Sequence, residues 1–269
     1  MRENAGLYRR KVTDMDYKNA FQFDGKVAMV TGAGGTIGRE IARGFAQCGA
    51  AVAAVDIDLA AAQETVAMLG ANGKEHTALC ADITNLTSVF NLVESILSIQ
   101  GHIDFLVNFA KINIRKPAIE LSEQEWDKVV DCNLKGTFLI SQAVGRSMLE
   151  RGYGRIVNLA SISSVRGVKN ASAYIASKSG VLQLTKALAH EWAETGITVN
   201  AVGPGYLKTN HTTALVDEPQ KYAALMSRIP MRRLGEINEI VGPILFLCSP
   251  LSSYITGQTI FVDGGRLVD

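Results

Sequence analysis

A tyrosine and a lysine four residues apart, Tyr174 and Lys178, are the residues of this sequence best suited to chemistry. If the segment is helical, this spacing places the phenol and the ammonium group on one face of the helix. A nearby cation favours phenolate and lowers the tyrosine pKa from its usual value of about 10. Such a tyrosine can exchange a proton with an alcohol or a ketone near neutral pH. Alone, the pair is weak evidence, because it could also be an ordinary pair on a helix surface.

A glycine-rich segment, Thr31–Gly38, is the second feature that could do chemistry. Gly32, Gly34 and Gly35 would keep a turn tight and let backbone amides approach a pyrophosphate, which the positive end of a following helix also attracts. The strict G-x-G-x-x-G pattern is not met, because Ile37 stands where its last glycine would fall. A plain connection between a strand and a helix explains the glycines equally well.

The end of the next β-branched run favours a dinucleotide. Asp56 lies 18 residues after Gly38, near the position where an acidic residue receives the ribose hydroxyls. Its carboxylate would repel the 2′-phosphate of NADP, and the loop itself carries no Lys or Arg, so NAD is expected and NADP is less favoured. Asp58 is expected to cap the next helix. Asp82 is equally compatible with an adenine contact and with a turn.

Short β-branched runs alternate with longer amphipathic segments along the chain. The expected strands are Val27–Thr31, Ala51–Val55, Thr77–Ala81, Phe105–Asn108, Arg155–Ala160, Thr198–Val202 and Thr259–Val262. The expected helices are Ile37–Cys48, Leu59–Leu69, Ser88–Ile99, Ser122–Arg151, Ala171–Glu194, Pro219–Ser227 and Glu236–Cys248. This order predicts an α/β fold, a doubly wound parallel sheet of about seven strands with helices on both faces. Ligands bind such sheets outside the carboxyl ends of the strands.

Composition restricts the class of protein. The 269 residues carry a net charge of +1, with 47% hydrophobic and 20% charged residues, so neither nucleic acid nor an anionic membrane is indicated as a partner. No apolar run is long enough for a membrane span, and residues 1–22 read as an N-terminal arm without a signal peptide. Residues 23–269 are expected to form one domain. The four cysteines form no CxxC pair or zinc spacing, which indicates a cytoplasmic protein without a metal site.

Together these residues resemble the classical short-chain dehydrogenase/reductases, from about Phe23 to Gly265. The matching motifs are the Thr31–Gly38 loop, Asp82-Ile83, Asn108-x-Ala110, Asn133-Leu134-Lys135-Gly136, Ser161, the YxASK motif Tyr174–Lys178, Pro204-Gly205 with Thr209, and Val262-Asp263-Gly264-Gly265. Ser161 precedes Tyr174 by 13 residues, which is typical of that family. The resemblance implies a Rossmann fold, an NAD(P)-dependent enzyme that acts on CH–OH groups and, as the family usually forms tetramers, a homotetramer.

The resemblance also implies a role for each site residue. Tyr174 would be the general acid/base, and Lys178 would hold the nicotinamide ribose and lower the tyrosine pKa. Ser161 would bind the substrate oxygen, and Asn133 would anchor a water in a proton relay, while hydride passes between cofactor and carbinol carbon. The implied cofactor-binding residues are Gly32, Gly34, Gly35, Thr36, Ile37, Asp56, Ile57, Asp82, Ile83, Asn108, Ala110, Lys111, Tyr174, Lys178, Pro204, Gly205, Leu207 and Thr209.

Three positions depart from the family pattern. Thr36 replaces its usual second glycine, Phe109 stands where a second Asn is common, and Lys111 replaces the glycine of the Asn-Asn-Ala-Gly stretch. If that glycine is needed for a positive φ, Lys111 costs stability. Alternatively, its amine reaches a phosphate or an anionic substrate. The sequence leaves both open.

Cations in two expected loops suggest a polar and possibly anionic small-molecule substrate. Arg115 and Lys116 follow the fourth strand, and Arg166 and Lys169 follow the fifth. Both loops should rim the pocket, where arginine suits a carboxylate, although each residue taken separately is more often an ordinary surface cation. The substrate-binding residues are therefore expected to be Ser161, Arg115, Arg166 and Tyr174.

The stretch Ile112–Pro117 resembles the gluconate 5-dehydrogenase-like branch of the family, which implies a sugar acid, a sugar or a polyol as substrate. A lid over Lys208–Ser227, which includes His211, is expected to close over it. The predicted function is an NAD(H)-dependent interconversion of a secondary alcohol and a ketone. The alternatives are an NADPH-dependent carbonyl or 3-oxoacyl reductase, which Asp56 disfavours, and a nucleotide-binding regulatory protein with weak activity.

Overall fold

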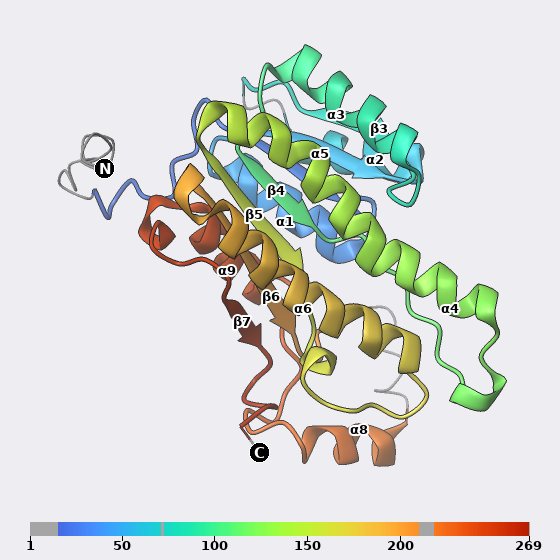
Figure 1. Cartoon of the computed structure of the whole chain (residues 1–269). Coiled ribbons are helices and arrows are strands. Elements are labelled where there is room, and N and C mark those ends of the chain that lie inside the picture. Colours follow the sequence, from blue (N-terminus) through green and yellow to red (C-terminus); the bar gives the residue numbers. More distant parts are fainter. Residues whose placement is uncertain (1–15, 71–72, 210–217, 269) are drawn as a thin grey trace, which may run out of the picture.

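The computed structural model describes residues 16–70, 73–209 and 218–268. Its seven strands form one parallel sheet in the order β3-β2-β1-β4-β5-β6-β7 (Figure 1). Their bounds are β1 (Val27–Thr31), β2 (Ala51–Asp56), β3 (Thr77–Cys80), β4 (Phe105–Asn108), β5 (Gly154–Leu159), β6 (Ile197–Pro204) and β7 (Thr259–Val262). The predicted doubly wound sheet is confirmed. The predicted bounds of β1, β4 and β7 are exact, and those of the other strands differ by at most two residues at an end.

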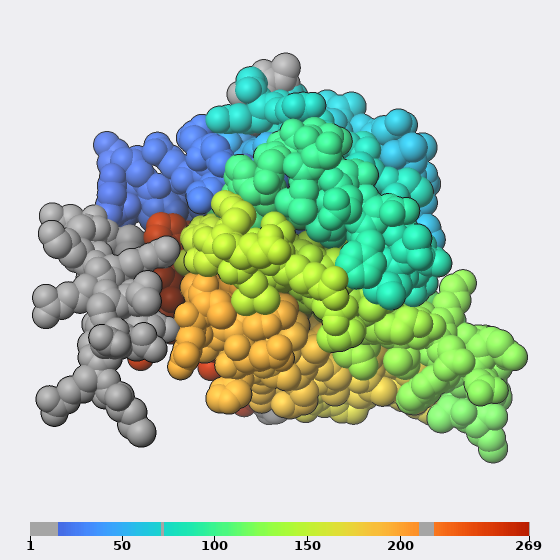
Figure 2. Space-filling model, turned by 45° about the horizontal axis from the view of Figure 1, so that its top comes forward, coloured from blue at the N-terminus to red at the C-terminus, as the bar shows by residue number. Residues whose placement is uncertain are grey.

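Helices cover both faces of the sheet. One layer holds α1 (Thr36–Gln47), α2 (Leu59–Leu69) and α9 (Asn238–Cys248), and the other holds α3 (Leu86–Gln100), α5 (Gly136–Arg151) and α6 (Ser172–Trp192). In Figure 2 the surfaces of α3, α5 and α6 lie side by side and hide the sheet behind them. The shorter elements are η1 (Ala118–Glu120), α4 (Glu123–Val130), η2 (Asp131–Lys135), η3 (Ile162–Ser164), η4 (Ala193–Thr195), α8 (Pro219–Met226) and η5 (Pro250–Ser252).

Two apolar cores separate these layers from the sheet. Because β1 and β4 are buried on both faces, they are apolar runs up to their last residues, Thr31 and Asn108, and do not alternate with polar residues. The buried strand β5 is an exception, since it carries Arg155 and Asn158. On the α1 side, the rings of Phe23, Phe45 and Phe105 stack within 4.8–5.9 Å of one another. These contacts hold the segment that precedes β1 against α1 and β4.

One predicted helix is interrupted. The sequence predicts a single helix over Ser122–Arg151, whereas the structure has α4, the π-helical turn η2, and α5. Within this turn the Gly136 amide donates to the Asp131 carbonyl, five residues back. A side chain at Gly136 would also meet Ile83 at 2.7 Å. π-Turns inside α-helices are frequent at functional sites, and this one carries Asn133.

The order in which strands are added reverses between β1 and β4. From β1 the chain continues to β2 on one side, and from β4 it continues to β5 on the other. Such a switch point opens a crevice at the carboxyl ends of the strands. Here Thr31 Oγ1 accepts from the amides of Phe109 (3.1 Å) and Ala110 (3.3 Å), which ties the two strand ends together. The loops after β1, β4 and β5 therefore meet at one edge of the sheet.

Some predictions fall outside the described residues. These are most of the N-terminal arm (residues 1–15) and the central part of the expected lid (residues 210–217), including His211. The flanking helix α8 agrees with the predicted Pro219–Ser227. In the described part of the chain, no helix is long and apolar enough to cross a membrane.

Candidate active site

The four predicted catalytic residues come from three elements at the carboxyl edge of the sheet. Ser161 follows β5 as the N-cap of η3, Tyr174 and Lys178 lie one turn apart on α6, and Asn133 lies in η2. Lys178 Nζ is 6.0 Å from the centroid of the Tyr174 ring. A hydrogen bond joins the side chains of Ser161 and Tyr174. The structure therefore brings the phenol, the hydroxyl and the ammonium group together.

The protonation of Tyr174 differs from the expected one. Burial of the phenol raises its pKa above the usual value, although the Ser161 hydrogen bond and the Arg115 charge act in the opposite direction. The expected lowering by Lys178 is wrong for the protein's own groups, because desolvation outweighs the attraction of nearby cations. Tyr174 is therefore held as a neutral phenol, ready to donate a proton to a ketone oxygen.

Lys178 is buried, and the one hydrogen bond that its ammonium group forms only partly offsets the loss of water. Its Nζ donates to the Leu159 carbonyl at 2.8 Å, and the whole residue is 1% exposed. Burial, followed by the charge of Lys111, lowers its pKa to about 7. Few lysines are buried to this extent without an anionic partner. The position thus favours a ligand that brings negative charge.

Asn133 is held inside the protein by its own side chain. Its Oδ1 accepts from the Ile112 amide (2.9 Å), while Nδ2 donates to the Ile112 carbonyl (2.9 Å) and to Ser177 Oγ (3.0 Å). These bonds use the whole amide, so its side chain fixes the segment after β4 to η2. The expected anchoring of a relay water by Asn133 stays a prediction.

The glycine-rich turn has the geometry of a phosphate site. Gly32 has a φ of +69°, and a Cβ on it would lie 2.8 Å from the Cα of Ala110, so only glycine lets the turn close against β4. Helix α1 starts at Thr36 after the N-cap residue Gly35, and no side chain caps it. Its first amides and the positive end of its dipole are therefore available to a phosphate. The residues fit the pyrophosphate of a dinucleotide.

Asp56 lies at the end of β2, as predicted. Its Oδ2 accepts from the Gly34 amide at 2.9 Å and its Oδ1 from the Asp58 amide at 3.1 Å. The neighbouring Asp58 caps α2, which confirms its predicted role. Asp82 Oδ1 accepts from the amide and hydroxyl of Thr84, which supports its interpretation as a turn residue; an adenine contact stays a prediction.

Two cavities lie along this edge. The first, which we call the Asp56 cavity, has a volume of about 340 Å³ and is lined by Thr31, Gly32, Val55, Asp56, Ile57, Ala81, Asp82, Ile83, Thr84, Ala110, Lys111, Ile112, Lys128, Asp131 and Cys132. The second, the Tyr174 cavity, has a volume of about 200 Å³ and is lined by Ile37, Phe109, Lys111, Asn113, Arg115, Leu159, Ala160, Ser161, Ile162, Ser163, Val168, Tyr174, Pro204, Gly205, Tyr206, Leu207 and Thr209. Most of the predicted cofactor residues line one or the other.

Two predicted site residues lie elsewhere. Asn108 is buried, and its Nδ2 donates to Ser141 Oγ and Asn158 Oδ1, both at 2.9 Å, so it ties β4 to β5 and α5 and does not face a ligand. Arg166 does not line the Tyr174 cavity, and its Nη1 is buried without a hydrogen-bond partner among the described residues. Lys116 forms an ion pair with Glu125 at 2.8 Å. Of the expected rim cations, only Arg115 reaches the cavity.

The sequence interpretation missed several residues that shape the site. Thr31 joins the ends of β1 and β4, and Ser177 accepts from Asn133 and donates to the Tyr174 carbonyl at 2.8 Å. Phe109, a departure from the family pattern, is an apolar residue of the core on the α1 side and also lines the Tyr174 cavity. The available signal for Thr31 and Ser177 was their position inside the Thr31–Gly38 and Tyr174–Lys178 motifs, each being a small hydroxyl residue.

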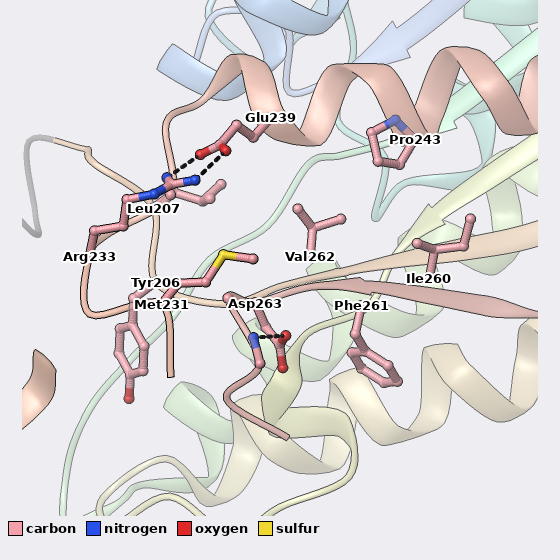
Figure 3. A pocket seen from close by; sticks show the side chains of 13 residues that line it. Tyr206, Leu207, Met231, Arg233, Glu239, Pro243, Ile260, Phe261, Val262 and Asp263 are labelled. Carbon is pink, nitrogen blue, oxygen red and sulfur yellow. Dashed lines mark hydrogen bonds and ion pairs between the residues drawn. The ribbon is translucent and has the colours of Figure 1, made fainter. Parts of the chain in front are cut away.

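A larger cavity lies between β7, α9 and the segment that precedes α9, and it adjoins the Tyr174 cavity at Tyr206 and Leu207. It has a volume of about 430 Å³. In Figure 3, Ile260 and Val262 point towards Pro243 of α9 while Phe261 points to the other face of β7. The charged pair at one end, Arg233 and Glu239, is joined by hydrogen bonds of 2.6 Å. Asp263 accepts from the amides of Gly265 and Leu267, so each charged side chain that lines this cavity in the described chain is already engaged, and its size does not indicate catalysis. No metal-binding cluster occurs within residues 16–70, 73–209 and 218–268.

Comparison with known proteins identifies close relatives. A family model described as Enoyl-(Acyl carrier protein) reductase matches residues 32–266. The 2-dehydro-3-deoxy-D-gluconate 5-dehydrogenase of Escherichia coli (strain K12) is 40% identical over 250 residues, which covers 93% of this chain and 98% of that protein. The galactitol 2-dehydrogenase (L-tagatose-forming) of Cereibacter sphaeroides is 41% identical over 94% of this chain and 100% of its own length. The crystal structure of a gluconate 5-dehydrogenase from Burkholderia cenocepacia J2315, in complex with NADP and tartrate, has a TM-score of 0.89 at 35% identity and covers 93% of this chain and 98% of that chain.

Proposed function

The chain belongs to the short-chain dehydrogenase/reductase family, and we propose that it interconverts a secondary alcohol and a ketone on a sugar acid, with NAD(H) as its cofactor. The observation that supports this proposal is the Tyr174 cavity, where a proton donor, a hydroxyl and a guanidinium group face one space. The dinucleotide, when bound, supplies the acceptor or donor of hydride at its nicotinamide ring. The remaining chemistry falls to the side chains.

Tyr174 and Ser161 handle the substrate oxygen. In the direction of reduction, the neutral phenol donates its proton to the ketone oxygen, while the Ser161 hydroxyl donates a hydrogen bond to the same oxygen and stabilises its developing charge. In the direction of oxidation, the phenolate form takes up the hydroxyl proton. Because burial raises the pKa of Tyr174, the phenol is the form present at neutral pH, which is the form that donates a proton in reduction. Lys178, whose Nζ lies 6.0 Å from the Tyr174 ring centroid, would hold the ribose of the bound cofactor and, when protonated, would stabilise the phenolate.

Arg115 is the basis for proposing an acid as substrate. It lines the Tyr174 cavity and its charge reaches Tyr174. A guanidinium group binds a carboxylate through two parallel hydrogen bonds. Relatives that act on sugar acids and polyols, and a neighbour that binds the dicarboxylate tartrate, support the same substrate class.

Replacing Arg115 tests this assignment. A panel of an aldonate, a polyol and a 3-oxoacyl thioester is assayed by the absorbance of reduced nicotinamide. The aldonate should have the highest kcat/KM, and Arg115→Gln should lower it by about 10- to 100-fold through loss of a charged hydrogen bond, with little change for the polyol. Arg146→Gln is the matched control, since that guanidinium lies over Phe90 and should not affect any substrate. A higher kcat/KM for the thioester than for the aldonate would contradict a sugar-acid substrate. An equal fall in kcat/KM for aldonate and polyol would show that Arg115 does not bind the carboxylate.

The proposed preference for NAD depends on Asp56. Removing its charge with Asp56→Asn keeps an oxygen that can accept from the Gly34 amide, but takes away the repulsion of a 2′-phosphate. The ratio of kcat/KM for NAD to that for NADP should fall by about tenfold or more. An unchanged ratio, or a wild-type protein that prefers NADP, would show that Asp56 does not select the cofactor.

We also propose a homotetramer in the cytoplasm. The outer strand β7 is half-buried along its length, and the segment Ile260–Gly265 lines the open cavity of Figure 3, as a subunit contact would require. The four cysteines are free thiols, which suits a reducing compartment. Light scattering should give four times the chain mass of 28.9 kDa; a monomeric mass would contradict the tetramer.

A further inference from the structure

Lys111 lies where the two cavities of the site meet. Among the lining residues of the described chain, it is the only one that the Asp56 cavity and the Tyr174 cavity share. Its backbone does not adopt a left-handed conformation, because the non-glycine residues with positive φ in the described segments are Asn170 and Arg232. Lys111 is therefore not strained by its backbone conformation. The other possibility is that its amine binds a phosphate or an anionic substrate.

The charge of Lys111 has no acidic partner within the part of the chain that the structure describes. No ion pair or hydrogen bond of its side chain is formed with a described residue, although Asp56, Asp82 and Asp131 line the same cavity. Each of these acids is engaged elsewhere: by the amides of Gly34 and Asp58, by Thr84, and by Lys135 respectively. Lys111 also acts on a second cation, since its charge contributes to the lowered pKa of Lys178.

A lysine that lines both cavities without an acidic partner among the described residues indicates a negatively charged ligand in the groove. A like-charge pair in a cleft is destabilising until an anion is bound, and a phosphate is the ligand that lysine commonly binds as a point charge. The segment after β4 is also rigid, because Asn133 holds both backbone groups of Ile112, the next residue. The backbone next to Lys111 is thus held in place, while its side chain lines both cavities.

The position of Lys111 between the two cavities indicates which phosphate of the cofactor it would bind. A dinucleotide bound with its ribose at Asp56 and its nicotinamide at Tyr174 must cross from one cavity to the other at its middle, which is the pyrophosphate. The uncapped N-terminus of α1 lies at the same crossing, with Gly32 lining the first cavity and Ile37 the second. We propose that Lys111 binds the cofactor pyrophosphate opposite the N-terminus of α1, which makes it a phosphate ligand at a position where the family pattern has glycine. This inference depends on the proposed function only in that the ligand is a dinucleotide.

Calorimetric titration of the full chain tests the inference, with NAD, NADP and ADP as the probes. ADP carries the two phosphates without the nicotinamide. Lys111→Met should weaken all three ligands by about 10- to 100-fold, as expected for loss of one charged hydrogen bond, and Lys111→Arg should restore most of the affinity. Lys186→Met, which removes an exposed lysine of α6, is the control and should bind as the wild type does. The melting temperature of Lys111→Met without ligand should equal or exceed that of the wild type, because an unpaired charge is removed.

Three results would overturn the inference. A loss confined to NADP would assign Lys111 to the 2′-phosphate, and unchanged affinity for NAD, NADP and ADP with a raised KM for the aldonate would assign it to the substrate. Unchanged dinucleotide affinity together with an unchanged KM for the aldonate would show that Lys111 binds neither cofactor nor substrate. If the wild-type protein bound neither NAD nor NADP, the proposed function would fail first, and the two failures are thereby distinguished.

Discussion

Tyr174→Phe should lower kcat by about a thousandfold in both directions, while the dissociation constant for the dinucleotide changes by less than about twofold. General acid–base groups contribute on the order of 10²- to 10⁴-fold to the rate, and the substitution removes only the hydroxyl. The ring, which lies 6.0 Å from Lys178 Nζ, stays in place. Stopped assays with high enzyme concentrations measure the residual rate, and calorimetry measures binding.

The matched control is Tyr254→Phe, because Tyr254 is fully exposed to solvent at 103% and lies outside both cavities. Its activity and melting temperature should equal those of the wild type. A Tyr174→Phe protein that retains more than about a tenth of the wild-type kcat would show that another group transfers the proton. A protein that loses dinucleotide binding as well would indicate a structural defect, which the melting temperature reveals.

Gly38→Ala should destabilise the protein by about 3 kcal/mol and weaken dinucleotide binding by more than about tenfold. A Cβ on Gly38 would lie 2.1 Å from the carbonyl oxygen of Gly32 and 2.9 Å from the Cα of Ala33, and both are backbone atoms that cannot move aside cheaply. Overpacking of this kind typically costs 1–3 kcal/mol or more. Relief requires α1 to shift, which moves the amides that face the phosphate. Urea unfolding and calorimetry measure the two effects.

Gly242→Ala in α9 is the control for that substitution. A Cβ on Gly242 meets no atom within 4 Å, and alanine in a helix interior is more favourable than glycine by up to about 1 kcal/mol. This variant should be as stable as the wild type or slightly more stable. If Gly38→Ala matched it in stability and affinity, the close packing of α1 against the turn would not govern the phosphate site.

The fold could be predicted from the sequence because its signals are local and repeated. Buried β-branched runs such as Val27–Thr31 alternate with amphipathic helices, and a parallel sheet is the arrangement that buries both. The interruption at η2 could not be predicted, because the turn depends on contacts far away in sequence. Gly136 packs against Ile83, and Asn133 binds the backbone of Ile112.

The identities of the site residues were predictable from motif and spacing, but their electrostatics were not. Tyr174 and Lys178 lie on one helix face, as their spacing requires, yet the pKa of the phenol rises. The sequence shows which charges are near but not how much water is excluded, and here desolvation is the larger effect. Likewise, the motif residue Asn108 and the loop residue Arg166 could be placed near the crevice, but the direction of each side chain depends on partners from other elements, such as Ser141 and Asn158 for Asn108.

Transfer of isotope from cofactor to product tests most directly whether Tyr174 and its neighbours assist a hydride transfer. Reduced dinucleotide deuterated at the nicotinamide C4 is incubated with the wild-type protein and the keto form of the best aldonate, and the product is examined by NMR and mass spectrometry. One deuterium should be found on the newly formed carbinol carbon and none in the solvent, and Tyr174→Phe should form labelled product about a thousandfold more slowly under the same conditions. Unlabelled hydroxy acid, or label that exchanges into water, would contradict the account.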